Sequence, residues 1–259
     1  MLLPPIIKVA ILAVIQGLTE FLPVSSSGHL VLAKHVMSFE TPGALLEISL
    51  HAGTLISILV YYRKRIMRLI RGIFIGEKNS INYGVLILVS AIPAAVIGLY
   101  FEKKIESLFN KASVVLMALC VTGIVLLSLI RVRNHDGRLN NRKSLIIGIA
   151  QALAIIPGIS RSGLTITCAR HLGLSPESSA EFSLLMSIPV IIGASMLKCG
   201  DVIVTNIGVT FPELFVGIVI SSFVGYFSIF CLAKALSSDK FWIFGIYCLT
   251  AGLLGVMVL

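Results

Sequence analysis

The fold of this chain is decided by two interrupted apolar stretches, QGLTEFLPVSSSGH at residues 16–29 and QALAIIPGISRSGLT at residues 151–165. Each closes a first apolar run, Ile6–Leu22 or Ser144–Ile156, and is followed by a second, short apolar piece. A helix broken by Pro, Gly and Ser at membrane depth is tolerated only where protein or a water-filled cavity surrounds it. We therefore predict that both stretches form re-entrant helical hairpins.

The composition places the chain in a membrane. Of its 259 residues, 57% are hydrophobic and 13% are charged, and the mean hydropathy is +1.00. A soluble domain is about 45–50% apolar and about 25% charged, so a cytosolic enzyme, a secreted disulfide scaffold and a disordered chain are excluded. Six apolar runs approach the roughly 20 residues that a spanning helix needs: 44–62, 81–101, 112–130, 182–197, 211–233 and 241–259. We predict an all-α polytopic membrane protein with six transmembrane helices and two re-entrant helical hairpins.

The two halves of the chain resemble each other. Ser25–Gly28 aligns with Ser160–Gly163 at an offset of 135 residues, and Glu47 aligns with Glu181 at an offset of 134. Each repeat, approximately 1–130 and 144–259 within a single membrane domain 1–259, then holds one hairpin and three spans. Because three crossings are odd and a re-entrant hairpin does not cross, the second repeat enters from the opposite side. The sequence thus predicts an inverted-topology repeat whose two hairpin tips meet near the midplane.

The distribution of Lys and Arg predicts the orientation. The segments 63–80, 131–143 and 234–240 carry thirteen of these residues, whereas 102–111 and 198–210 carry four. Positively charged loops face the cytoplasm, so we expect both termini and the mouth of the first hairpin to lie outside. This distribution also explains the net charge of +9 without a nucleic-acid partner. An eight-span model would place two of the basic segments on opposite faces, and the charge count disfavours it.

The broken hairpins carry the residues that are suited to chemistry. Gln16 and Glu20 lie four residues apart on one helix face, and an intramembrane carboxylate is a functional hypothesis by default. The Ser25–His29 turn offers hydroxyls, backbone N–H groups and an imidazole to an oxyanion. The guanidinium of Arg161, in the turn Ser160–Gly163, is suited to bidentate contact with a phosphate or carboxylate. Together these groups favour phosphoryl transfer, in which positioning and charge neutralisation do most of the work.

Structural roles are the alternatives to this interpretation. Glu20 could brace the broken backbone, and Arg161 could form an ion pair with Glu20 or Glu47 that only holds the hairpins together. Glu47, with His51 one turn later, and its repeat mate Glu181 could each cap or brace its own hairpin.

The paired motifs resemble those of the undecaprenyl-diphosphate phosphatase family, the bacitracin-resistance lipid phosphatases. The resemblance lies in Gln16 through His29, in Pro157 through Thr165 and in Glu181-Phe182-Ser183, and it extends over essentially the whole chain. It implies an integral-membrane phosphatase that converts undecaprenyl (C55 isoprenyl) diphosphate to the monophosphate carrier of cell-wall synthesis. It also implies a divalent cation, Mg²⁺ or Ca²⁺, and a site toward the outer face of the plasma membrane.

Carried over by position, the resemblance implies roles for Gln16, Glu20, Ser26, His29, Arg161, Ser162 and Thr165. We expect Arg161 to bind the diphosphate with the backbone amides of Ser25–Gly28 and Gly163, flanked by the serines of both turns: Ser25, Ser27, Ser160 and Ser162. Glu20 is expected to hold the metal, and Ser26 to act as nucleophile with His29 or Glu20 taking its proton. Attack by a water that Glu20 activates, or by His29 itself, is the open alternative. Gln16 occupies a position where the family has Glu or Gln, which weakens any scheme with two metal-binding carboxylates.

Two other functions compete with the phosphatase. Inverted repeats, broken helices and midplane charges are typical of secondary transporters, so a transporter or lipid flippase is the alternative from another class. A purely structural membrane scaffold gives no reason for two charged, broken hairpins. Expected partners are the isoprenyl diphosphate lipid, the bilayer and a second copy of the chain in a homodimer.

Overall fold

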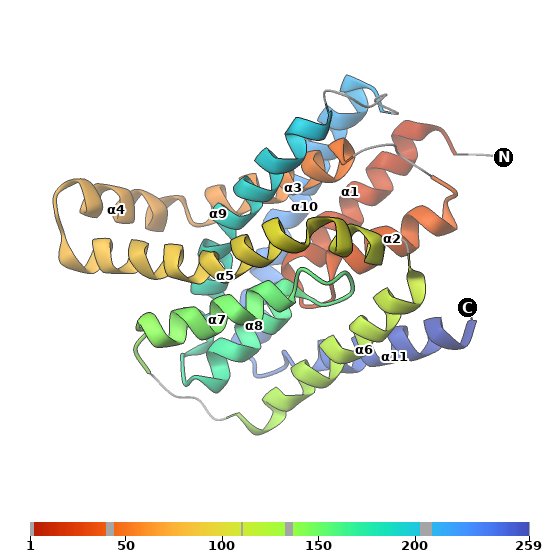
Figure 1. Cartoon of the computed structure of the whole chain (residues 1–259). Coiled ribbons are helices and arrows are strands. Elements are labelled where there is room, and N and C mark those ends of the chain that lie inside the picture. Colours follow the sequence, from red (N-terminus) through yellow and green to blue (C-terminus); the bar gives the residue numbers. More distant parts are fainter. Residues whose placement is uncertain (1–2, 40–43, 110, 133–136, 203–208, 259) are drawn as a thin grey trace.

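The computed structural model describes residues 3–39, 44–109, 111–132, 137–202 and 209–258. In these ranges every regular element is a helix (Figure 1). The first half contains α1 (Pro5–Phe21), α2 (Ser26–Val36), α3 (Leu45–Tyr61), α4 (Arg63–Phe74), α5 (Lys78–Phe109), α6 (Ala112–Leu127) and the 3₁₀ turn η1 (Ser128–Arg131). The second half contains α7 (Asn141–Leu153), α8 (Arg161–His171), α9 (Pro176–Val202), α10 (Phe211–Ser237) and α11 (Ile243–Val258).

The order of these elements follows the predicted repeat. The hairpin α1–α2 is followed by α3, α5 and α6, and the hairpin α7–α8 is followed by α9, α10 and α11. The packing is reciprocal, because α1 packs on α10 of the other half while α7 packs on α5, and α3 contacts α10 while α9 contacts α5. α1 begins and α11 ends on the same side of the molecule (Figure 1). Both predicted hairpins are therefore present, and each is held mainly by the opposite half.

The chain is a multi-pass membrane protein. Among the described residues, four helices are long and apolar enough to cross a bilayer: α5, α6 with η1, α9 and α10. A fifth candidate is α3 together with α4, which bend by 76° at their junction. The last predicted span, 241–259, forms an apolar helix of only 16 residues in α11, and its final residue lies outside the described ranges. The total of six spans stays a prediction.

Close approach of the helices depends on small side chains, as is usual in membranes. A Cβ atom at Gly53 of α3 would lie 2.0 Å from the hydroxyl oxygen of Ser221 on α10. A Cβ atom at Gly123 of α6 would lie 2.8 Å from the carbonyl oxygen of Gly245 on α11. These contacts fix the long helices around the hairpins, and the polar residues of the hairpins are thereby buried in protein.

Two predicted loops are helical. The basic segment 63–80 contains the amphipathic helix α4, which buries Leu69 and exposes Arg63, Lys64, Arg68 and Arg71. The predicted loop 102–111 instead continues α5 to Phe109, past non-helical backbone at Phe101. Both segments were predicted to be loops because they are rich in charged residues, although charged residues also occur on the exposed faces of helices.

Candidate functional site

The two hairpin tips are built in the same way. Ser25 precedes α2 and accepts a hydrogen bond from the Gly28 amide at 3.3 Å, and Ser160 precedes α8 and accepts one from the Gly163 amide at 3.1 Å. A serine that accepts from the third residue of the helix is a favoured N-cap, and it explains why each broken helix restarts at this point. The backbone amides of Gly28 and Gly163, which we expected to bind a phosphate, therefore donate to the capping serines instead.

The tips pack against each other through glycine. Gly158 has a φ of +96°, and a Cβ atom there would lie 2.2 Å from the Val115 carbonyl oxygen on α6. A Cβ atom at Gly28 would approach the Gly158 Cα atom to 3.3 Å. Any larger residue at Gly158 would meet both a strained backbone and a steric clash, so this glycine sets the distance between the hairpins.

Glu20, at the end of α1, is the centre of the site. Its Oε1 atom accepts a hydrogen bond from Arg161 Nη2 at 2.5 Å, and its Oε2 atom accepts one from the Ser26 hydroxyl at 2.6 Å. Gln16 Nε2 donates to the same Oε2 atom at 3.1 Å. The Glu20 side chain is only 6% exposed, and a carboxylate this buried needs such partners. The prediction that the two tips meet is confirmed by the contact between Glu20 and Arg161.

Several polar atoms around this centre lack a partner within the described residues. They are Arg161 Nη1, Gln16 Oε1 and Glu47 Oε2, and all three are buried. Leaving a buried donor or acceptor unsatisfied costs about 1–3 kcal/mol, and such atoms in a native site call for a ligand or water. The free guanidinium nitrogen is suited to an anion, and the free oxygens are suited to a cation or a donor.

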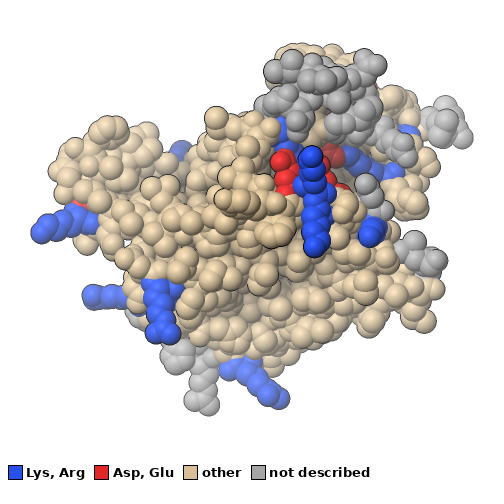
Figure 2. All heavy atoms as spheres, in the orientation of Figure 1, with Lys and Arg blue, Asp and Glu red and all other residues tan. Residues whose placement is uncertain are grey.

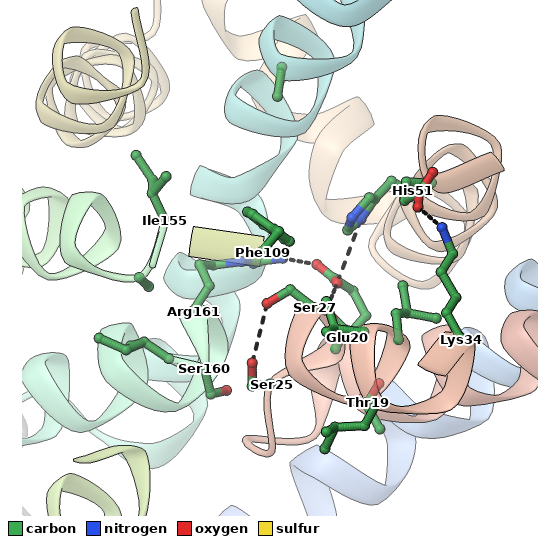
Figure 3. A pocket seen from close by; sticks show the side chains of 18 of the residues that line it. Thr19, Glu20, Ser25, Ser27, Lys34, His51, Phe109, Ile155, Ser160 and Arg161 are labelled. Atoms are coloured by element: carbon green, nitrogen blue, oxygen red, sulfur yellow. Dashed lines mark hydrogen bonds and ion pairs between the residues drawn. The ribbon is translucent and has the colours of Figure 1, made fainter. Parts of the chain in front are cut away.

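A cavity of about 1430 Å³ opens onto these groups. It is lined by Glu20, Ser26 and Arg161, by further polar residues that include Lys34, Glu47, His51 and Lys198, and by the apolar side chains of Leu30, Val31, Phe109, Ala112, Val190, Ile191 and Ala194. Figure 3 shows Arg161 reaching from α8 toward the Glu20 carboxylate. In Figure 2 most of the visible acidic side chains gather in a hollow bordered by basic ones. The cavity can therefore accommodate an anionic head group joined to an apolar tail.

His29 lies on a different side of the turn from Glu20. Its Nδ1 atom is 2.9 Å from the Ser25 carbonyl oxygen, and its Nε2 atom is 2.7 Å from the Tyr247 hydroxyl, on whose ring it stacks. Because a carbonyl only accepts, Nδ1 is the donor, and in the neutral ring Nε2 accepts the Tyr247 hydroxyl proton. Ser25 has a φ of +68°, an uncommon conformation for serine, and His29 binds its carbonyl group. The structure thus gives His29 contacts suited to holding the turn, and the hydroxyl of Ser26 contacts Glu20.

The other predicted residues divide between the cavity and its support. Ser25, Ser27 and Ser160 line the cavity, where Ser25 and Ser27 hydroxyl oxygens are 3.3 Å apart. Ser162 donates to the Leu22 carbonyl at 3.4 Å, and Thr165 donates to the Arg161 carbonyl at 2.7 Å. These two side chains fix α8, and with it Arg161, rather than facing the cavity.

Sequence reasoning named one further contact only as an alternative and missed two. Lys34 pairs with Glu47, in agreement with the alternative that Glu47 braces its own hairpin. Glu181, the repeat mate of Glu47, pairs instead with Arg65 of α4 at 2.8 Å and so does not brace its own hairpin. His51 contacts Gln16 at 2.9 Å. The one pattern in the sequence that pointed to His51 was its position one turn after Glu47 on the same helix.

Within the part of the chain that the structure describes, no group of three His, Cys, Asp or Glu side chains is placed so that it could hold a metal ion by itself. A weaker arrangement fits. Mg²⁺ is commonly held by one or two carboxylates together with oxygens of an anionic ligand. The Glu20 carboxylate and the unpartnered Gln16 Oε1 atom supply oxygen donors of this kind, so the site is suited to a cation that is shared with a ligand.

Comparisons with known proteins match the chain to one family. Residues 9–254 match the family model described as bacitracin resistance protein BacA. A protein named undecaprenyl-diphosphatase from Halothermothrix orenii is 37% identical over 257 residues, which cover 98% of each chain. One from Thermosipho melanesiensis is 38% identical, covering 92% of this chain and 94% of its own. Undecaprenyl-diphosphatase 1 from Bacillus licheniformis is 35% identical, covering 96% of each chain.

Proposed function

We propose, from the premise that this chain belongs to the bacitracin resistance protein BacA family, that it hydrolyses undecaprenyl diphosphate to undecaprenyl phosphate and inorganic phosphate. The relatives that match nearly its whole length are named for this activity. One observation in the structure carries the proposal. A guanidinium and a serine hydroxyl from opposite hairpins bind the same buried carboxylate in the wall of a large cavity that polar and apolar side chains line together.

Arg161 has the first role in the mechanism. Its Nη1 atom is buried without a partner among the described residues, and it is suited to a non-bridging oxygen of the terminal phosphate. As the diphosphate enters, the guanidinium exchanges part of its contact with Glu20 for the phosphate. The Glu20 carboxylate then becomes available to the hydroxyl that it already contacts.

Ser26 and Glu20 perform the transfer. The Ser26 oxygen attacks the terminal phosphorus, its proton passes to Glu20 Oε2 across the 2.6 Å hydrogen bond, and the bond from phosphorus to the bridging oxygen breaks. Undecaprenyl phosphate leaves with the electron pair of that bond. Water then attacks the phosphoserine, the bond between the Ser26 oxygen and phosphorus breaks, Glu20 returns its proton to that oxygen, and inorganic phosphate leaves. His29, bound to Ser25 and Tyr247, positions the turn that presents Ser26.

A divalent cation accompanies the substrate in this proposal. Glu20 and Gln16 Oε1 would hold Mg²⁺ or Ca²⁺ together with oxygens of the diphosphate. When bound, the ion neutralises charge on the phosphates.

Phosphate release from undecaprenyl diphosphate by the purified protein in detergent tests the function. We expect release that requires Arg161, Glu20 and an added divalent cation. Binding without release would refute the phosphatase and favour the transporter, since transport needs no bond cleavage.

We also propose that the protein lies in the plasma membrane with its cavity open to the outer face. The charge count supports this orientation. In a cysteine-free background, single cysteines at the exposed residues Asn79 and Arg138 should react with an impermeant thiol reagent only after the membrane is opened. Ser107→Cys is the matched control and should react in intact cells. Labelling of only one of the first two positions would refute the inverted repeat.

The protein is also proposed to form a homodimer, and a measurement of its size in detergent would test this.

A further inference from the structure

A second imidazole lies at the centre of the site, and the mechanism above does not use it. His51, on α3, lines the same cavity as Ser26 and Arg161. Its side chain is 33% exposed, and its Nδ1 atom lies 3.6 Å from Glu20 Oε2. Figure 3 shows it directed at Glu20 from the side opposite Arg161. His51 is therefore placed where a bound phosphoryl group would be in reach.

The hydrogen-bond network determines which ring nitrogen of His51 carries the proton. Glu20 accepts from Arg161 and Ser26, so the atom of Gln16 that faces it must be the donor nitrogen, Nε2. That NH₂ group has two hydrogens, of which one goes to Glu20 Oε2 at 3.1 Å and the other to His51 Nδ1 at 2.9 Å. His51 Nδ1 is consequently an acceptor, and the ring proton is on Nε2.

The Nε2–H group of His51 is therefore a donor that faces no acceptor among the described residues. The structure gives Nε2 of His51 no hydrogen-bond partner among the described residues, whereas Nδ1 is engaged by Gln16. We propose that His51 is a catalytic residue whose Nε2–H donates to a non-bridging oxygen of the phosphoryl group being transferred. The proposal rests on the proposed function and extends it, because Arg161 and His51 would then stabilise the developing charge from two sides.

The same network gives Gln16 a specific task. Its amide donates to both Glu20 and His51, so it holds the imidazole in the tautomer that presents a donor. A carboxylate at this position would instead accept from Nδ1–H and move the ring proton. Gln16 is therefore a positioning residue for His51 as well as a neighbour of the carboxylate.

Two substitutions separate this role from a structural one. In His51→Gln the amide nitrogen replaces Nε2, so the donor to phosphate is retained and the acceptor for Gln16 is lost. In His51→Asn the amide oxygen replaces Nδ1, so the contact with Gln16 is retained and the distal donor is lost. We expect His51→Asn to lower kcat by about 10²–10³-fold, as for removal of one preorganised donor, and His51→Gln to retain most of the activity.

The matched control is His171, which contacts Ser128 at 2.7 Å at the far end of α8. Both His171→Asn and His171→Gln should keep wild-type turnover. If His51 serves only as an acceptor for Gln16, the order reverses, with His51→Asn active and His51→Gln impaired. That order, or two fully active His51 variants, would overturn the proposal.

A binding measurement keeps the test independent of turnover. Inorganic pyrophosphate with Mg²⁺ should raise the melting temperature of wild type and His51→Gln, because a ligand that binds the folded state stabilises it. The rise should be much smaller for His51→Asn, and equal rises in both variants would overturn the role of Nε2. A wild-type protein that binds pyrophosphate but releases no phosphate from the lipid would refute the proposed function and leave the binding role of His51 intact.

Discussion

Replacement of Arg161 by lysine separates the geometry of the site from its charge. Arg161 donates through Nη2 to Glu20 at 2.5 Å and keeps Nη1 buried without a partner among the described residues. A guanidinium can contact a carboxylate and a phosphate through different nitrogens of one rigid plane. An ammonium is a single point charge, so the side chain of the Arg161→Lys variant would serve one of these partners poorly.

The expected loss follows from the number of contacts. Arg161→Lys keeps the positive charge and removes one charge-assisted hydrogen bond, which is worth about 1.5–3 kcal/mol. At about 1.4 kcal/mol for each factor of ten, kcat/KM should fall by about 10- to 100-fold. Phosphate release from undecaprenyl diphosphate by purified protein, compared at equal protein and Mg²⁺ concentrations, measures this loss.

A matched control is available in Arg65, which is also paired with a glutamate, Glu181, at 2.8 Å, but lies outside the cavity. Arg65→Lys should leave turnover within about twofold of wild type, because a partly exposed ion pair contributes little and does not touch the reaction. Both variants should elute as folded protein. An Arg161→Lys variant with wild-type turnover would show that charge alone suffices, and the two-pronged contact would be wrong.

Three further predictions follow from the same contacts. Ser26→Ala should reduce phosphate release by orders of magnitude, whereas Ser25→Ala and Ser27→Ala should cost less, and equal losses at all three would indicate a water nucleophile. Glu20→Gln should lose phosphate release, and the rise in melting temperature that pyrophosphate with Mg²⁺ produces should require a higher Mg²⁺ concentration, because a neutral amide is a poorer ligand for a hard cation; an unchanged Mg²⁺ dependence of the melting temperature would restrict Glu20 to the role of base or brace. Gly158→Ala should lower the melting temperature, since its φ of +96° and the Val115 carbonyl 2.2 Å from the new Cβ atom both oppose the substitution, and a thermal melt that matches wild type would contradict the packing of the tips.

The sequence predicts the hairpins because two simple constraints act on them. Pro, Gly and Ser interrupt apolar runs at residues 23–28 and 157–163, and the bilayer permits such interruptions only inside protein. α4 was missed because its basic residues were counted as loop charge, although Ile66, Leu69, Ile70 and Ile73 follow the spacing of an amphipathic helix. The extension of α5 to Phe109, in which no residue from 102 to 109 is buried, consists largely of the good helix formers Glu, Lys and Leu, and its charges were likewise counted as loop charge.

The sequence predicted which residues form the site better than it predicted how they contact one another. Charged and hydroxyl residues in broken helices mark Glu20, Ser26 and Arg161, since an apolar environment makes them costly without a function. Their mutual distances depend on how the two halves dock. The contacts of His29 and His51 also depend on docking. His29 contacts Tyr247, which is 218 positions away in the sequence, and His51 reaches the site from α3.

The repeat explains why one site is built from two similar halves. At the offset of 135, Ser26 aligns with Arg161, and each is the first residue of the helix that follows its broken tip. These two positions meet on Glu20. Position 155, which aligns with Glu20, is an isoleucine in the cavity wall, so the second half contributes a cation and no competing carboxylate. Gln151, the mate of Gln16, is buried with neither polar side-chain atom bonded among the described residues, as expected for a residue whose half lacks the carboxylate. The site therefore combines two hairpin tips of similar backbone with different side chains at the aligned positions.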